Sequence, residues 1–208
     1  MRVALDTVYA DDVPAQDTLS IMDTLERLDP LTYTAARSAK YPDTEFGLAL
    51  KQTAMLIKAE VGLEVSAIDV GGWDTHFAQG STSGLMPNLM EDLVEGLAAF
   101  HADMFDHMQD LTTVSMSEFG RRASENGSLG TDHSHGSMMM VLGGNVNGGK
   151  VHGEWPGMRE GQLIGPGDLA VTTDYRDVLS EILTRQLNNE ALSDIFPNHE
   201  PRMVGIIG

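Results

Sequence analysis

The spacing of apolar residues predicts three amphipathic helices, over residues 44–62, 85–109 and 174–187. In each segment apolar side chains recur every three or four positions, which is the repeat of one helix face. The apolar positions are Phe46, Leu50, Ala54 and Ile57 in the first segment, Leu89, Leu93, Leu97, Phe100 and Met104 in the second, and Tyr175, Val178, Leu179, Ile182 and Leu183 in the third. Asp174 is the expected N-cap of the third helix. Acidic residues of the second helix, Asp103 among them, are expected to face water.

Three short apolar runs predict buried strands, at residues 63–70, 111–116 and 138–142. Because helices alternate with these strands, the order favours an α/β fold with a layered, mostly parallel sheet and flanking helices. The first 42 residues are polar and weakly patterned, apart from a short helix expected to end near Leu28. We therefore divide the chain into an N-terminal polar and helical segment, 1–42, and an α/β part, 43–208.

The composition of the chain excludes several classes of protein and of metal site. The chain has 208 residues, a formal net charge of −18 and no cysteine. The negative charge opposes phosphate backbones, so binding to nucleic acid through a basic surface is not expected. No apolar run approaches the roughly 20 residues of a membrane span. Without thiolates, any bound metal must be held by His, Asp or Glu.

Two Gly-framed clusters carry residues that could bind a metal. Asp74 and His76 stand in a loop after the first predicted strand, and Asp132, His133 and His135 stand within four positions of one another. Carboxylate and imidazole together suit a divalent transition metal, and glycine lets the backbone turn sharply around such a site. The alternative is that each carboxylate orients a histidine for a structural reason only.

A third cluster, residues 117–122, follows the second predicted strand. Glu118 at a strand end could act as a base or as a metal ligand, and Arg121 and Arg122 could bind an oxyanion. The alternative is an internal ion pair. These three are the candidate catalytic residues of the chain.

The clusters occur in an order that resembles one protein family. The motifs are GGWDTH at residues 71–76, SEFGRR at 117–122, an Asn-Gly step at 126–127, GTDHSHG at 130–136, GGNVNGGKVHGEWPG at 143–157 and TTDYRDVL at 172–179. They resemble the bacterial proteins called domain of unknown function 1501, with one departure, since Ser134 stands where that family usually has glycine.

The resemblance implies a fold similar to that of the alkaline phosphatase and sulfatase superfamily, of which this chain would be the C-terminal half. It places metal ligands at Asp74, His76 and His133, and a possible ligand at Glu118, while Phe119 cannot be one. It also implies export to the periplasm by the twin-arginine route. By the same resemblance, the chain would need the missing N-terminal half or would oligomerise.

The function that the resemblance implies is metal-dependent hydrolysis of phosphate or sulfate esters. The metal would be Zn, Mn, Mg or Ca, held by Asp74, His76, Asp132, His133 and His135, and the substrate a small anionic ester or a sulfated or phosphorylated glycan. The alternative is a non-catalytic binding or scaffold protein that keeps the fold and has lost the nucleophile.

Overall fold

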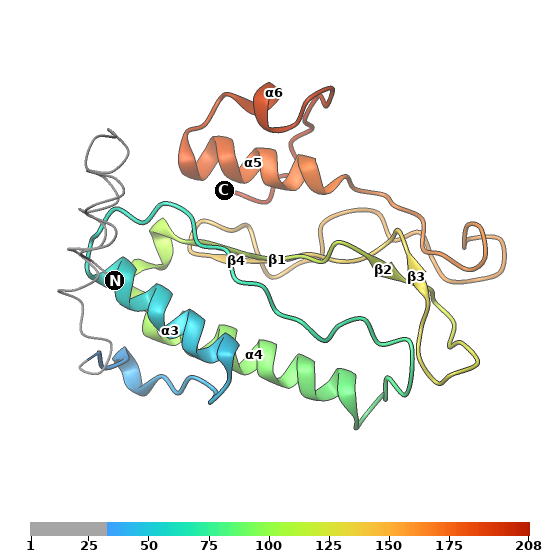
Figure 1. Cartoon of the computed structure of the whole chain (residues 1–208). Coiled ribbons are helices and arrows are strands. Elements are labelled where there is room, and N and C mark those ends of the chain that lie inside the picture. Colours follow the sequence, from blue (N-terminus) through green and yellow to red (C-terminus); the bar gives the residue numbers. More distant parts are fainter. Residues whose placement is uncertain (1–32) are drawn as a thin grey trace, which may run out of the picture. The chain divides into compact units, whose positions relative to one another are not determined.

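The structure, a computed structural model, describes residues 33–208 (Figure 1), and their backbone contacts divide them into two compact units. Of the described residues, the first unit comprises 33–70 and 92–103, and the second comprises 71–91 and 104–208. The short helix expected before Leu28 lies outside the described residues. Among the residues that are described, no helix combines the length and the apolar character needed to cross a bilayer.

The first unit contains two of the predicted helices. These are α3 (Glu45–Lys58) and the C-terminal part of α4 (Leu85–Asp103), and they follow a short 3₁₀ turn, η1 (Ala36–Ser38). The apolar faces meet where Gly96 lies against the ring of Phe46, since a Cβ at Gly96 would overlap that ring. The helices therefore form where the apolar repeat predicts them. Their buried apolar residues are Phe46, Leu50, Ala54, Leu93, Leu97, Ala99 and Phe100.

Asp103 corrects one expectation for α4, because its side chain is buried rather than facing water. The carboxylate pairs with Lys58, and it accepts hydrogen bonds from the hydroxyls of Tyr33 and Tyr41, both at 2.7 Å, and from the backbone N–H of Ala36. Burial alone would raise the pKa of Asp103, but these donors outweigh it and lower the pKa. The helical repeat could not reveal this, because the partners come from other segments.

The second unit contains four short strands in two antiparallel pairs. Strand β1 (Thr112–Ser115) pairs with β4 (Met140–Gly143), and β2 (Gly120–Arg121) pairs with β3 (His133–Ser134). The predicted strands at 111–116 and 138–142 are thus present. The remaining elements are η2 (Phe105–Asp110), α5 (Tyr175–Leu187) and α6 (Leu192–Ile195).

The mostly parallel sheet was a wrong expectation for the described residues. Both sheets are antiparallel pairs, and the run at 63–70 forms no strand. A buried parallel strand needs neighbours on its edges and cover on both faces. Residues 63–70 have no ladder partner, and most of them are exposed. This apolar run therefore has no regular secondary structure.

Helix α5 packs on the β1–β4 sheet, and the C-terminal segment packs with it (Figure 1). Its cap is the predicted one, since the side chain of Asp174 accepts from the backbone N–H of Arg176. Tyr175 was expected on the buried face but is 51% exposed. The buried cluster consists of Val178, Ile182 and Ile206, with Val114 and Val141 of the sheet and Met139, Val146, Val204 and Ile207 packed against it.

Three polar residues of α5 are also buried, Asp177, Ser180 and Glu181, and Glu181 is only 2% exposed. Its carboxylate accepts backbone hydrogen bonds from Val204, Gly205 and Ile207, at 2.7, 2.8 and 2.9 Å. Burial alone would raise the pKa of Glu181, but the backbone donors outweigh it and lower the pKa. The C-terminal segment is therefore anchored to α5 by a charged group as well as by apolar packing.

Candidate metal centre

The pairing of β2 with β3 positions one half of the candidate site. Arg121 and His133 are opposite each other in this pair, and Gly120 is opposite Ser134. A Cβ at Gly120 would overlap the carbonyl oxygen of Gly136, so only glycine allows the two backbones to approach this closely. The glycine of the SEFGRR motif therefore allows the close backbone approach that positions this half of the site.

The other half of the site comes from the loop that holds Asp74 and His76. This loop is fixed to residues 126–131, because the N–H of Thr131 donates to the carbonyl of Thr75 at 3.2 Å. Gly130 lies so close to the His76 backbone that a Cβ there would overlap it. Residues far apart along the chain, which sequence alone could not join, are thereby held together.

Asp74, His76 and His133 converge at this point. Oδ1 of Asp74 lies 3.0 Å from Nε2 of His76 and 2.7 Å from Nε2 of His133. The imidazole centroids are 4.8 Å apart, with their planes inclined by 39°. All three side chains are about half exposed, at 56%, 47% and 48%. Among the described residues, these three form a group whose ligand atoms are close enough to hold one metal ion.

The donor set fits a divalent metal. In tetrahedral zinc sites with N and O ligands the ligand atoms lie about 3.3 Å apart, slightly farther than the Asp74–His distances here. Hydrogen bonds between carboxylate and imidazole account for the shorter separations. Two imidazoles and a carboxylate suit zinc or manganese better than magnesium or calcium, which prefer oxygen ligands. Exposure leaves the remaining coordination positions accessible from solvent.

Arg121 holds Asp74 in place. Its NH2 group donates to Oδ1 of Asp74 at 2.7 Å and to the carbonyl of Trp73 at 2.9 Å, and its NH1 group donates to the carbonyl of Thr131 at 2.7 Å. The hydrogen bond from His133 and, to a smaller extent, that from Arg121 lower the pKa of the Asp74 carboxyl. Most of the guanidinium is therefore occupied by protein acceptors, and its place in the structure is that of a support for Asp74.

Phe119 is a site residue that sequence reasoning considered only as an impossible ligand. Its ring stacks on the imidazole of His133, with centroids 4.4 Å apart and planes inclined by 12°. The guanidinium of Arg121 lies 4.7 Å from the centroid of the same ring. The side chain therefore restricts the orientation of both neighbours. The sequence feature that could have indicated a role for Phe119 is its position in the strand-end motif, between Glu118 and Gly120.

Asp132 lies behind His76. Its Oδ1 is 3.5 Å from Nδ1 of His76, the ring nitrogen that faces away from Asp74. Asn126 donates to the same carboxylate oxygen at 3.0 Å, and Arg122 lies 3.3 Å from Oδ2. The Asn126 hydrogen bond is the main cause that lowers the pKa of Asp132. A carboxylate on the second nitrogen of a histidine is the arrangement that orients metal-binding imidazoles.

Asn126 organises the loop that joins the two halves of the site. Its Nδ2 donates to the carbonyl of His76 and to Asp132, both at 3.0 Å, and its Oδ1 accepts from the N–H groups of Ser128 and Gly130, at 2.9 and 3.1 Å. Sequence reasoning recorded this residue only as part of an Asn-Gly step. Asn and Asp favour such local hydrogen bonds in turns, so the Asn-Gly pair in the sequence indicated a turn held by the Asn side chain.

Other candidates from the sequence lie outside the group of three. His135 is 85% exposed and lies 3.7 Å from Oδ2 of Asp168, a residue that sequence reasoning missed. Asp168 is nearly buried and lies 3.6 Å from Nε of Arg122, so Arg122 stands between Asp168 and Asp132. Glu118 is exposed and is not in the group. No pattern around Asp168 linked it to the histidines in advance.

Comparison with known proteins identifies the family. A profile of the family described as "Protein of unknown function (DUF1501)" matches residues 14–190. The matched residues include all three segments that build the candidate metal centre. Neither the comparison with curated proteins nor that with solved structures gives a match. The family expected from the motifs is confirmed, and the chain belongs to the DUF1501 family.

Proposed function

We propose that the chain is a metal-dependent hydrolase acting on phosphate or sulfate esters. The observation that carries the proposal is the convergence of Asp74, His76 and His133. A metal held there would polarise an ester oxygen and acidify a bound water, which is the chemistry that such hydrolysis requires. The likeness to the alkaline phosphatase and sulfatase superfamily belongs to this proposal and rests on the sequence motifs.

The charges of the chain support a role for the metal in substrate binding. A net charge of −18 repels anions at long range. Arg122 is shared between two carboxylates, and Arg121 is largely occupied by Asp74 and backbone carbonyls. A local cation that is not already paired is therefore needed to attract an anionic ester. The metal at the group of three would supply that charge.

The protein residues have distinct roles in this proposal. Asp74, His76 and His133 hold the metal, and zinc or manganese fits the donor set best. Asp132 orients His76, while Arg121 and Phe119 orient Asp74 and His133. Glu118 stays the candidate for the proton transfer that activates water.

Metal analysis tests the site directly. The purified chain is treated with a chelator, reloaded with zinc or with manganese, and dialysed, after which bound metal is measured by plasma mass spectrometry. We expect about one metal per chain, and its loss in His76→Ala and in His133→Ala. His107→Ala is the matched control, because His107 is outside the group, and it should retain the metal. Metal-free wild-type protein, or unchanged metal in both site variants, would overturn the assignment.

Activity is a separate measurement. The loaded protein is incubated with aryl phosphates and aryl sulfates, and release of the phenol is followed. Hydrolysis that is lost in His133→Ala but kept in His107→Ala supports the hydrolase. Bound metal without turnover of any ester would instead favour a binding protein that keeps the site.

A further inference from the structure

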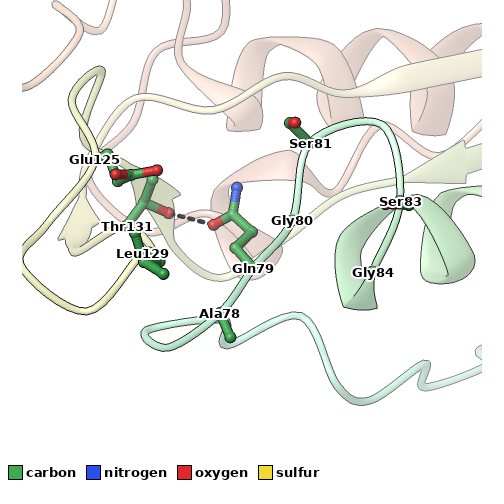
Figure 2. Close-up of a pocket in the computed structure, with 10 residues that line it drawn as sticks. Ala78, Gln79, Gly80, Ser81, Ser83, Gly84, Glu125, Leu129 and Thr131 are labelled. Atoms are coloured by element: carbon green, nitrogen blue, oxygen red, sulfur yellow. Dashed lines mark hydrogen bonds between the residues drawn. The ribbon is translucent and has the colours of Figure 1, made fainter.

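A pocket opens beside the candidate metal centre, and none of the three residues of that centre lines it. Its volume is about 540 Å³, within the roughly 300–1,000 Å³ of small-molecule sites. Two segments line it, at 78–84 and 125–131, which directly follow His76 and precede Asp132 (Figure 2). The pocket is therefore built on the segment that follows His76 and on the segment that leads to His133.

The two walls are held together by backbone hydrogen bonds. The N–H of Ala78 donates to the carbonyl of Ser128 at 3.0 Å, and the N–H of Gln79 donates to the carbonyl of Leu129 at 2.9 Å. Gly130 both lines the pocket and packs on the backbone of His76. Pocket and metal centre thus share one frame, and a ligand bound in the pocket would lie next to the metal.

The amide of Gln79 is oriented by its neighbours. Its Oε1 accepts from the hydroxyl of Thr131 at 2.7 Å and from that of Thr75 at 2.9 Å, and Thr75 is buried. With the oxygen engaged twice, the NH₂ group is the end left for a ligand. Figure 2 shows its nitrogen directed away from Thr131, and no acceptor in the described part of the chain is bonded to it. Gln79 therefore presents two N–H donors.

The other polar groups of the lining complement these donors. Glu125 supplies a carboxylate that can only accept hydrogen bonds, and Ser81 supplies a hydroxyl that donates or accepts. The charge of Glu125 disfavours an anionic group in the pocket. Hydroxyl groups satisfy both kinds of partner, since each can accept from Gln79 and donate to Glu125. The lining therefore suits an uncharged group with several hydroxyls.

We propose that this pocket binds the hydroxylated alcohol part of the substrate, so that the substrates are esters of sugars or polyols. This inference rests on the proposed function for the part that concerns the ester. The anionic group would lie at Asp74, His76 and His133, and the alcohol part would lie against Gln79 and Glu125. The pocket thereby selects the substrate, and the metal centre acts on it.

Neutral probes test the pocket without the ester chemistry. Methyl hexosides and myo-inositol are titrated against the full chain and binding is followed by NMR, with cyclohexanol as a ring of similar size that carries one hydroxyl. Gln79→Glu is the informative variant, because a carboxylate keeps the acceptors for Thr75 and Thr131 and removes the N–H donors. Gln52→Glu is the matched control, since it makes the same change at an exposed position of α3.

We expect the polyol probes to bind wild type and Gln52→Glu equally, and cyclohexanol to bind more weakly. Gln79→Glu should weaken polyol binding about tenfold, as expected for a lost hydrogen bond, and Glu125→Gln should weaken it in the same direction. Metal content should not change in either variant. Absence of polyol binding in wild type, or equal binding in Gln79→Glu, would overturn the pocket assignment even if the metal binds. Polyol binding by a chain that binds no metal would overturn the proposed function and leave the pocket standing.

Discussion

Glu181 offers a prediction whose size follows from the structure. The side chain is 2% exposed and holds three backbone N–H groups of the C-terminal segment. Oε2 accepts from Val204 and Gly205, and Oε1 accepts from Ile207. The substitution Glu181→Gln keeps the shape but replaces one oxygen with an NH₂ group. That group faces an N–H donor and cannot accept its hydrogen bond.

The least costly orientation of the new amide places nitrogen toward Ile207, so that one hydrogen bond is lost and two are kept. A hydrogen bond to a charged group contributes about 1.5–3 kcal/mol, and the two that remain lose their charge assistance. The expected loss in the free energy that holds residues 204–207 to α5 is therefore about 3 kcal/mol. This corresponds to a roughly 100-fold change in the opening equilibrium.

Hydrogen exchange measured by mass spectrometry reads this local opening directly. Peptides that cover residues 203–208 should exchange roughly 100-fold faster in Glu181→Gln than in wild type. Glu190→Gln, the same change at an exposed position near the end of α5, should exchange like wild type. If Glu181→Gln left these peptides as protected as in wild type, the carboxylate would not anchor the C-terminal segment, and the reasoning would fail.

Three further predictions concern Glu181, Asp103 and Gly120. The pKa of Glu181 is lowered in the folded chain, so the stability that its carboxylate contributes is present above the unfolded pKa of about 4.3 and is lost as the pH falls through the folded pKa. The hydrogen-exchange rates of wild type and Glu181→Gln should therefore converge over that pH range, and a constant difference between them would contradict this. Asp103→Asn should destabilise the first unit by about 3 kcal/mol, because Lys58 loses its buried counter-charge. Urea unfolding, monitored by hydrogen exchange of the amides in α3, measures this loss, and unchanged protection of those amides would oppose the prediction. Gly120→Ala should abolish metal binding while the helices stay folded by circular dichroism, since a Cβ would separate β2 from the Gly136 backbone; full metal content in this variant would count against the site.

Local sequence patterns predicted the elements that depend on local interactions. The apolar repeats of α3, α4 and α5 and the cap at Asp174 are satisfied within single segments, and these helices are present with similar bounds. The end of α4 differs, because residues 105–110 tighten into the 3₁₀ helix η2 instead of extending it. The pattern of residues 63–70 was misleading, since an apolar run is consistent with a strand but cannot supply a partner.

Burial of polar groups could not be predicted from the same patterns. The apolar repeat of α4 predicts that Asp103 faces water, and the apolar face predicted for α5 does not include Glu181. Each is covered instead, Asp103 by Lys58 and the tyrosines, and Glu181 by the C-terminal backbone. A carboxylate is buried only when donors replace its water, and those donors come from distant segments. Hydrophobic periodicity contains no information about them.

At the candidate site, the motifs indicated which residue types could bind a metal, and the long-range backbone contacts set which of those residues lie together. Short motifs framed by glycine identified Asp74, His76, Asp132, His133 and His135 as the residues able to bind a metal. Only the folded chain shows that three of them converge, because Asp74 and His133 are 59 residues apart and meet through the β2–β3 pair and the loop held by Asn126. Distances between side chains depend on such long-range backbone contacts. A motif therefore names the ligand types, and the fold selects which of them can share one ion.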